Sequence, residues 1–144
     1  MLPKMVDGVL PPGIHDATWA ELAETFGQTP HRKTLLGGLR AAAIELRRSG
    51  CRTLYLDGSF VTAKEVPEDY DGCWSAEGVD PEELDLVLLT FDEGQATQKA
   101  KYLGELFPAE TVEAGSGKTF RDFFQADQDG RPKGIVQLDL AGIP

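Results

Sequence analysis

Apolar residues recur at helical spacing in the first third of the chain and gather in short runs farther on. Residues 18–26 and 30–49 each place apolar side chains on one face at intervals of three and four positions, which predicts two amphipathic helices. Thr18 and Glu21 have the spacing of a capping box, and Pro30 suits the first position of a helix. We therefore expect the two helices to begin at these residues.

Short stretches rich in apolar residues predict β-strands where Gly, Pro and Asp bound them. Four such stretches cover residues 51–57, 69–75, 110–114 and 134–140. The chain begins differently, because the prolines of residues 1–15 remove hydrogen-bond donors and restrict the residues before them. We expect this first segment to be an extended arm.

Three further helices are predicted in the second half of the chain. Residues 80–91 open with Asp-Pro-Glu-Glu, which combines a capping acid, a proline at the first helical position and acids in the first turn. Residues 95–106 form a second candidate, and Thr119 can cap a short third helix. This order of elements predicts an α+β fold, in which residues 1–144 form one domain with a small mixed or antiparallel sheet flanked by helices.

The charge of the chain narrows the range of its partners. The net charge of −10 disfavours broad binding to nucleic acid, because such binding depends on neutralising phosphates with Lys and Arg. No stretch has the apolar length of a membrane-spanning helix, and the opening segment is too broken by Pro and Gly for a signal peptide. Cys51 and Cys73 lack metal-binding spacing, so we expect reduced thiols in a cytoplasmic protein with no membrane partner.

The candidate chemistry lies between residues 54 and 74. The first predicted strand ends in Gly58-Ser59, where glycine lets the backbone approach a phosphate and serine offers a hydroxyl and an amide to its oxygens. Asp69 and Asp71 are two positions apart, so on a strand both carboxylates point from one face. Carboxylates suit Mg²⁺, which also takes substrate phosphates. The pattern predicts a site for Mg²⁺ and a nucleoside triphosphate, with the geometry of two-metal phosphoryl transfer.

A Gly-Ser pair at a strand end, followed by Asp-x-Asp, resembles the nucleotidyltransferases of the DNA polymerase β superfamily. The segments DGSFVTAKEVPEDYD and FFQADQDGRPKGIVQLDL resemble a group of short bacterial proteins of that type, over about residues 11–140. The resemblance implies a polymerase β-like fold. Asp57 and Gly72 stand where the superfamily usually carries hydrophobic residues. Thr62 and Lys64 lie between the Gly-Ser pair and the Asp-x-Asp motif, where they could reach the triphosphate.

Members of that superfamily carry a third carboxylate on a later strand, between hydrophobic residues. The best local match is Leu-Asp-Leu at positions 138–140, which assigns Asp139 to the metal site. Glu113 is the first alternative and Asp92 the second.

These residues support two functions of different kinds. The first is a magnesium-dependent nucleotidyltransferase that moves a nucleoside monophosphate to a hydroxyl of a protein or small molecule, for example within a toxin–antitoxin pair or a defence system. An RNA 3′ end is the alternative acceptor. The second function is a binding or antitoxin module with weak or no catalysis. The chain lacks the helical domain that many relatives use to hold their substrates, so a protein partner or a homodimer could complete the site.

Overall fold

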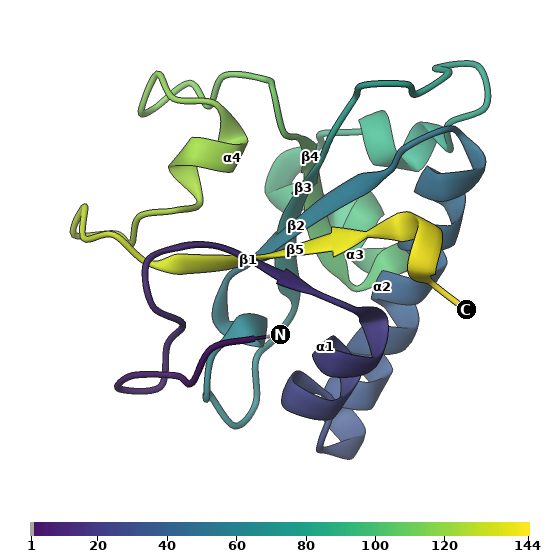
Figure 1. The fold of residues 1–144 in the computed structure, drawn as a ribbon. Coiled ribbons are helices and arrows are strands. Elements are labelled where there is room, and N and C mark those ends of the chain that lie inside the picture. Colours follow the sequence, from purple (N-terminus) through teal and green to yellow (C-terminus); the bar gives the residue numbers. More distant parts are fainter. Residues whose placement is uncertain (1) are drawn as a thin grey trace.

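Strands from both halves of the chain form one mixed sheet in the computed structural model, which describes residues 2–144 (Figure 1). The five strands are β1 (Gly13–Ala17), β2 (Thr53–Asp57), β3 (Tyr70–Trp74), β4 (Gly104–Pro108) and β5 (Gly134–Asp139). They lie in the order β1-β5-β2-β3-β4. β1 is parallel to β5 and β3 to β4, whereas β2 is antiparallel to both of its neighbours. The predicted α+β class with a small mixed sheet is confirmed.

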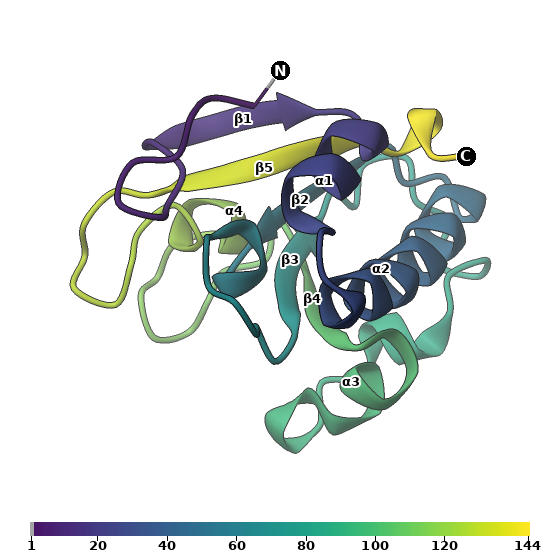
Figure 2. The ribbon, with the colours of Figure 1, turned by 90° about the horizontal axis from the view of Figure 1, so that it is seen from below.

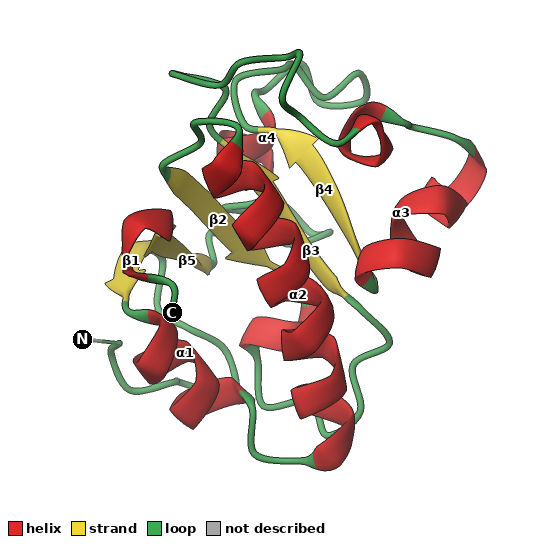
Figure 3. Ribbon diagram, turned by 90° about the vertical axis from the view of Figure 1, so that its right-hand side faces the viewer, coloured by secondary structure: helices red, strands yellow, loops and turns green. Residues whose placement is uncertain are grey.

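The helices lie on both sides of this sheet. The α-helices of the described residues are α1 (Trp19–Phe26), α2 (Pro30–Arg48), α3 (Ala96–Tyr102) and α4 (Phe120–Phe123). α1 and α2 lie on one side of the sheet and α4 on the other (Figure 2), while α3 lies beside β4 (Figure 3). The predicted capping box of Thr18 and Glu21 is present, and the side chain of Thr29 caps α2. None of the described helices is both long and apolar enough to cross a membrane.

The main hydrophobic core lies between the sheet and the two long helices. Alternate strand residues point to this side and are almost fully buried, among them Leu54, Leu56, Leu106, Val136 and Leu138. They pack in one cluster with the predicted stripe of α2, which consists of Leu35, Leu39, Ala42, Ala43 and Leu46. Because side chains alternate along a strand, the residues in between point to the opposite face of the sheet. That second face carries the candidate site described below.

The N-terminal segment is more than an extended arm, so that prediction is wrong for its last residues. Strand β1 begins at Gly13 and pairs in parallel with β5, with Ala17 opposite Leu138. Its local pattern conceals the strand, because Ile14 and Asp16 are both exposed. The pairing depends on a partner near the other end of the chain, which local periodicity does not report.

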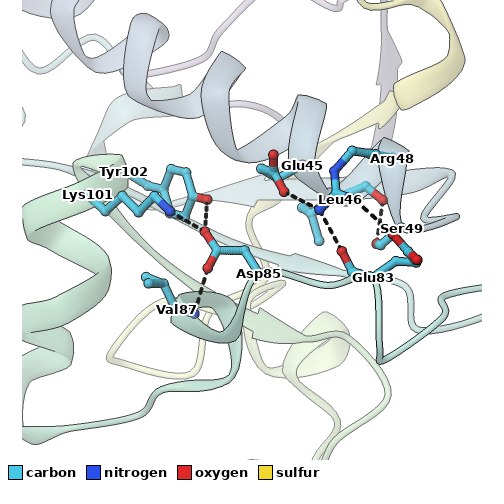
Figure 4. Close-up of polar contacts among 9 residues, drawn as sticks. All are labelled: Glu45, Leu46, Arg48, Ser49, Glu83, Asp85, Val87, Lys101 and Tyr102. Carbon is cyan, nitrogen blue, oxygen red and sulfur yellow. Dashed lines mark hydrogen bonds and ion pairs between the residues drawn. The ribbon is translucent and has the colours of Figure 1, made fainter.

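Residues 80–91 do not form the predicted α-helix. The carboxylate of Asp80 accepts a hydrogen bond from the amide two residues later, which closes a tight turn instead of capping a helix. Asp85 has an extended backbone, and its carboxylate accepts hydrogen bonds from two side chains of α3, Lys101 and Tyr102 (Figure 4). A short 3₁₀ turn over Leu86–Leu89 follows. Contacts with α3 therefore outweigh the local helix signals.

The helix predicted over residues 95–106 ends early, at Tyr102, and the remainder enters the sheet as β4. Leu103 adopts a left-handed backbone conformation with φ of 66°, which ends the helix. Gly104 then packs on the ring of Tyr70, where an added Cβ would lie 2.5 Å from ring atoms. This contact has no room for a side chain, so glycine is required where the chain enters the sheet.

Two shorter predictions have opposite outcomes. The strand predicted at residues 110–114 is wrong, because this segment is a loop with an isolated bridge between Val112 and Thr119. The short helix predicted after Thr119 is confirmed as α4, and the threonine side chain caps it by accepting a hydrogen bond from the Asp122 amide.

Candidate functional site

Three acidic side chains lie next to one another across β2, β3 and β4. Asp57 is opposite Asp71, and Asp71 is opposite Glu105. Adjacent strands in a sheet are about 4.8 Å apart, so these side chains are close neighbours. All three point away from α1 and α2, because adjacent residues such as Leu56 and Leu106 belong to the main core. We call Asp57, Asp71 and Glu105 the acid row.

Asp69 adds a fourth carboxylate beside this row. It lies two positions before Asp71 and immediately before β3, and its carboxylate still reaches that of Asp71. Carboxylate oxygens of Asp69, Asp71 and Glu105 all lie within 4.8 Å of one another. We call these three residues the carboxylate cluster. Hard oxygen ligands at this spacing fit the magnesium ion that the sequence motif predicts.

Lys99 approaches the carboxylate cluster from α3. Its Nζ lies 2.9 Å from the carboxylate of Glu105 and 3.6 Å from that of Asp69. The hydrogen bond with Glu105 is the largest cause of a raised pKa for the lysine. The sequence pattern predicts a solvated lysine here, but the tertiary structure gives it two acidic partners. Lys99 therefore balances part of the negative charge of the cluster.

Burial raises the pKa values of Asp57, Asp69 and Asp71, and repulsion from neighbouring acids adds to the effect at Asp69 and Asp71. The pKa of Asp71 rises to about 7, first because of burial and then because of the charges of Asp69 and Glu105. Burial is also the largest cause of the raised pKa of Asp69. The pKa of Asp57 is raised by burial as well, although the charge of Lys133 counteracts part of the effect. Several neighbouring acids with raised pKa values are typical of functional sites.

We expect the contribution of Asp71 to the stability of the metal-free protein to fall as the pH rises from about 4 to about 7. Folded Asp71 keeps its proton up to a pH of about 7, whereas its ordinary pKa is 3.8. Between these values the folded state binds more protons than the unfolded state, so the free energy of unfolding decreases with rising pH. Urea denaturation in EDTA at several pH values measures this effect as the difference between the parent and Asp71→Asn. An identical pH dependence in the two proteins would contradict the placement of Asp71.

Gly58 brings the Gly-Ser turn against the acid row. Its φ of 81° lies in the left-handed region, and an added Cβ would lie 2.3 Å from Oδ2 of Asp71. Glycine is therefore required both by the backbone conformation and by the close approach. Ser59 begins the next turn, and both residues line a cavity of about 410 Å³ that reaches Asp57 and Asp71. The structure thus places the predicted pair Gly58-Ser59 beside the predicted acids.

Thr62 and Lys64, the other predicted nucleotide-binding residues, have different positions. Thr62 lines the same cavity, and its hydroxyl donates a hydrogen bond of 2.6 Å to the carbonyl of Ser59. Lys64 is exposed and lies outside the set of residues that line this cavity. Its backbone carbonyl accepts a hydrogen bond from Arg32. The structure therefore brings Thr62 to the site and does not bring the side chain of Lys64 there.

Arg32 anchors the loop that contains these residues. Its position on the polar face of α2 predicts a solvated side chain, but only 6% of the residue is exposed. The guanidinium donates hydrogen bonds to four backbone carbonyls, those of Phe26, Phe60, Thr62 and Lys64. The segment that follows Gly58-Ser59 is therefore fastened to α2 through one buried cation.

The predicted third carboxylate, Asp139, lies away from the carboxylate cluster, so its assignment to the metal site is wrong. Asp139 pairs with Thr53 at the opposite end of β2 from Asp57, which separates the two acids by four residues, or about 13 Å. Its carboxylate accepts a hydrogen bond from the amide two residues later. The alternatives are not part of the cluster: Glu113 accepts hydrogen bonds within its own loop, and Asp92 accepts them from Thr97 in the first turn of α3.

Glu105 holds the position that the sequence motif suggested for Asp139. A signal for it exists, because the run Gly-Glu-Leu-Phe-Pro at positions 104–108 is an acid within apolar residues bounded by glycine and proline. The helix predicted over residues 95–106 concealed this signal, since Tyr102 and Leu106 also fit helical spacing. The acid that completes the carboxylate cluster thus lies on β4, the strand next to β3.

The rest of this sheet face is covered by α4 and its flanking loops. A second hydrophobic cluster consists of Tyr55, Cys73, Ala109, Phe124 and Ile135, with Phe107 and Phe120 packed against it. Tyr55 and Cys73 lie two positions from Asp57 and Asp71 along their strands, so the apolar cover ends where the acid row begins. The acids therefore lie at the uncovered end of the face, next to the cavity at Gly58.

Comparison with known proteins identifies a family without a described activity. No curated protein and no solved structure matches the chain. Residues 3–139, which are nearly the whole chain, match DUF6932, a family of unknown function. The protein therefore belongs to the family DUF6932.

Proposed function

We propose that this protein is a magnesium-dependent nucleotidyltransferase. The observation that carries the proposal is the position of Gly58-Ser59 against Asp71, at the open end of a sheet face where the cluster carboxylates lie within 4.8 Å of one another. A phosphate-binding turn beside a set of hard oxygen ligands is the combination that transfer of a nucleoside monophosphate needs. The resemblance of the same motifs to the polymerase β superfamily supports this reaction.

Each residue then has a separate task. Asp69, Asp71 and Glu105 would hold the magnesium, and Ser59 would offer its hydroxyl to the phosphates of a nucleoside triphosphate. Bound magnesium neutralises charge on the attacking and leaving oxygens of a phosphoryl transfer. Gly58 keeps the turn close enough to Asp71 for one substrate to touch both motifs.

The acceptor that we favour is a hydroxyl group of a protein or a small molecule. The net charge is −10, and three acids but a single lysine line the cavity beside the Gly-Ser turn. Such a surface is poorly suited to holding a long RNA by its backbone, since that affinity comes largely from Lys and Arg at the phosphates. Transfer to a partner protein, as in a toxin–antitoxin pair, requires no basic track.

Glu105 and Asp139 provide a matched test of the proposed function. The purified protein, with magnesium and each α-labelled nucleoside triphosphate, is incubated with lysate protein, small-molecule extract or total RNA. We expect Glu105→Gln to lower label transfer at least about a hundredfold, because a metal ligand is lost, and Asp139→Asn to leave it within about twofold.

Two results of this test would overturn parts of the proposal. Equal losses in the two variants would remove Glu105 from the site. Label on RNA 3′ ends alone, at physiological salt, would overturn the order of acceptors. A parent protein that neither binds nor turns over any triphosphate in magnesium would overturn the nucleotidyltransferase function itself.

A further inference from the structure

The cavity beside the acid row contains one basic side chain that the sequence motifs do not include. The lining of this space of about 410 Å³ includes Asp57, Gly58, Ser59, Asp71 and Asp127, and Lys133 is its single basic residue. Lys99, the other lysine near the acids, pairs with Asp69 and lines a separate cavity together with it.

The backbone holds Lys133 in a defined place. Its amide donates a hydrogen bond of 2.8 Å to the carbonyl of Gln125, and the next residue, Gly134, begins β5 and bonds to the carbonyl of Leu10. The side chain extends to the acid row, where Nζ lies 2.9 Å from Oδ1 of Asp57. The lysine charge is therefore fixed at the wall of the cavity next to the Gly-Ser turn.

The ion pair between Lys133 and Asp57 calls for an explanation. The Asp57 side chain is only 8% exposed, whereas that of Lys133 is 27% exposed. Burying such a pair gives little net stability, because the loss of hydration offsets most of the attraction. An acid that positions a cation beside the Gly-Ser turn gives this ion pair a role that its small contribution to stability does not supply.

We propose that Lys133 binds the terminal phosphates of the nucleoside triphosphate and that Asp57 positions it to do so. The inference rests on the proposed nucleotidyltransferase function. An ammonium group has three N–H donors, so Lys133 can keep its bond to Asp57 and still donate to phosphate oxygens. A triphosphate placed between Ser59 and the acid row would otherwise meet only acids among the charged side chains that line the cavity.

Binding measurements with Lys133→Met test this inference. We use titration calorimetry in magnesium with inorganic tripolyphosphate and with each of the four common ribonucleoside triphosphates. Loss of a charged phosphate contact is expected to weaken Kd by about ten- to hundredfold. Lys118→Met, at an exposed turn, is the matched control and is expected to bind as the parent does. Thermal unfolding of each variant verifies that it is folded.

A second comparison, made in the Asp57→Asn variant, separates a loss of substrate binding from a loss of folding. Lys133→Met leaves the buried Asp57 without its partner, so the comparison is repeated between Asp57→Asn and Asp57→Asn/Lys133→Met. Asn keeps an Oδ1 acceptor for the Lys133 ammonium, so a loss of at least about tenfold is expected in this pair too. Kd values within about threefold in both comparisons, with a parent that binds triphosphate, would overturn the role of Lys133 alone. A parent that binds no triphosphate would instead overturn the proposed function, and the role of Lys133 with it.

Discussion

Replacing Asp71 by Asn is expected to abolish nucleotidyl transfer and, in the same protein, to raise the stability of the metal-free fold. Asp71 is the central member of the acid row, and its neighbours Asp57, Asp69 and Glu105 all raise its pKa. Removing a ligand from the proposed magnesium site should lower the rate of the proposed transfer by about a thousandfold or more. An activity loss with a stability gain distinguishes a functional acid from a structural one.

The stability gain has an electrostatic cause. At pH 8 the parent must keep a carboxylate ionised although burial and three nearby acids oppose it, and its pKa of about 7 reports this cost. Asn has nearly the same shape without the charge, so we expect the free energy of unfolding to rise by on the order of 2 kcal/mol in EDTA. The gain should shrink when magnesium is added, because only the parent then gains stability by binding the metal.

Asp16→Asn provides the matched control for this prediction. Asp16 lies on β1, at the other edge of the same sheet, and is exposed. Urea denaturation with and without magnesium, together with label transfer, should show no change beyond about 0.5 kcal/mol in this variant. A large loss of stability in Asp71→Asn without magnesium would mean that this carboxylate supports the fold, and the proposed metal site would then lose its central ligand.

Replacing Arg32 by Met is expected to cost about 3 kcal/mol of stability, the largest effect that we predict for a single basic residue. The buried guanidinium donates to four carbonyls, and the loop carbonyls of Phe60, Thr62 and Lys64 would lose this donor together. Met keeps much of the apolar stem, so the loss reports mainly the hydrogen bonds. The Gly-Ser turn should also become more mobile, which we expect to raise KM for the triphosphate.

Lys33→Met is the control for Arg32→Met, because Lys33 is the next residue of α2 and is exposed. Urea denaturation measures the stability of both variants, and amide hydrogen exchange of residues 58–64 reports the mobility of the loop. Arg32→Lys should lie between the two, since an ammonium group cannot reach four carbonyls at once. Equal stability of Arg32→Met and Lys33→Met would show that the four hydrogen bonds contribute nothing.

Local signals in the sequence were sufficient for the elements that begin and end through their own residues. Thr18 and Glu21 cap α1, Thr29 caps α2, and their apolar stripes face the core as periodicity predicts. The spacing also predicted that Asp69 and Asp71 would lie together, and their carboxylates do, although Asp69 lies just before β3 and not on it. Gly58 was predictable as well, since only glycine allows its backbone conformation at a close approach.

Partners across the sheet were decided by the tertiary structure alone. Glu105 belongs to the carboxylate cluster because β4 pairs with β3, and that pairing depends on a left-handed turn at Leu103 that helical periodicity conceals. Asp139 fits the local motif but lies at the wrong end of β5, since the register places it opposite Thr53. Spacing in the sequence predicts the face of the sheet from which a side chain points. The register between strands determines which residues of the neighbouring strands it lies beside.

The basic residues show most clearly the difference between what the sequence predicts and what the tertiary structure decides. Arg32, Lys99 and Lys133 are ordinary polar positions in the sequence, yet one is buried under a loop and two are paired with acids of the site. A long cationic side chain can lie in water or reach a partner several ångströms away. The neighbouring residues in the sequence do not determine which of these two positions it takes. The sequence by itself determined α1, α2, α4, the Gly-Ser turn and two acids. The assembled sheet decided which charges meet, because those contacts join residues distant in the chain.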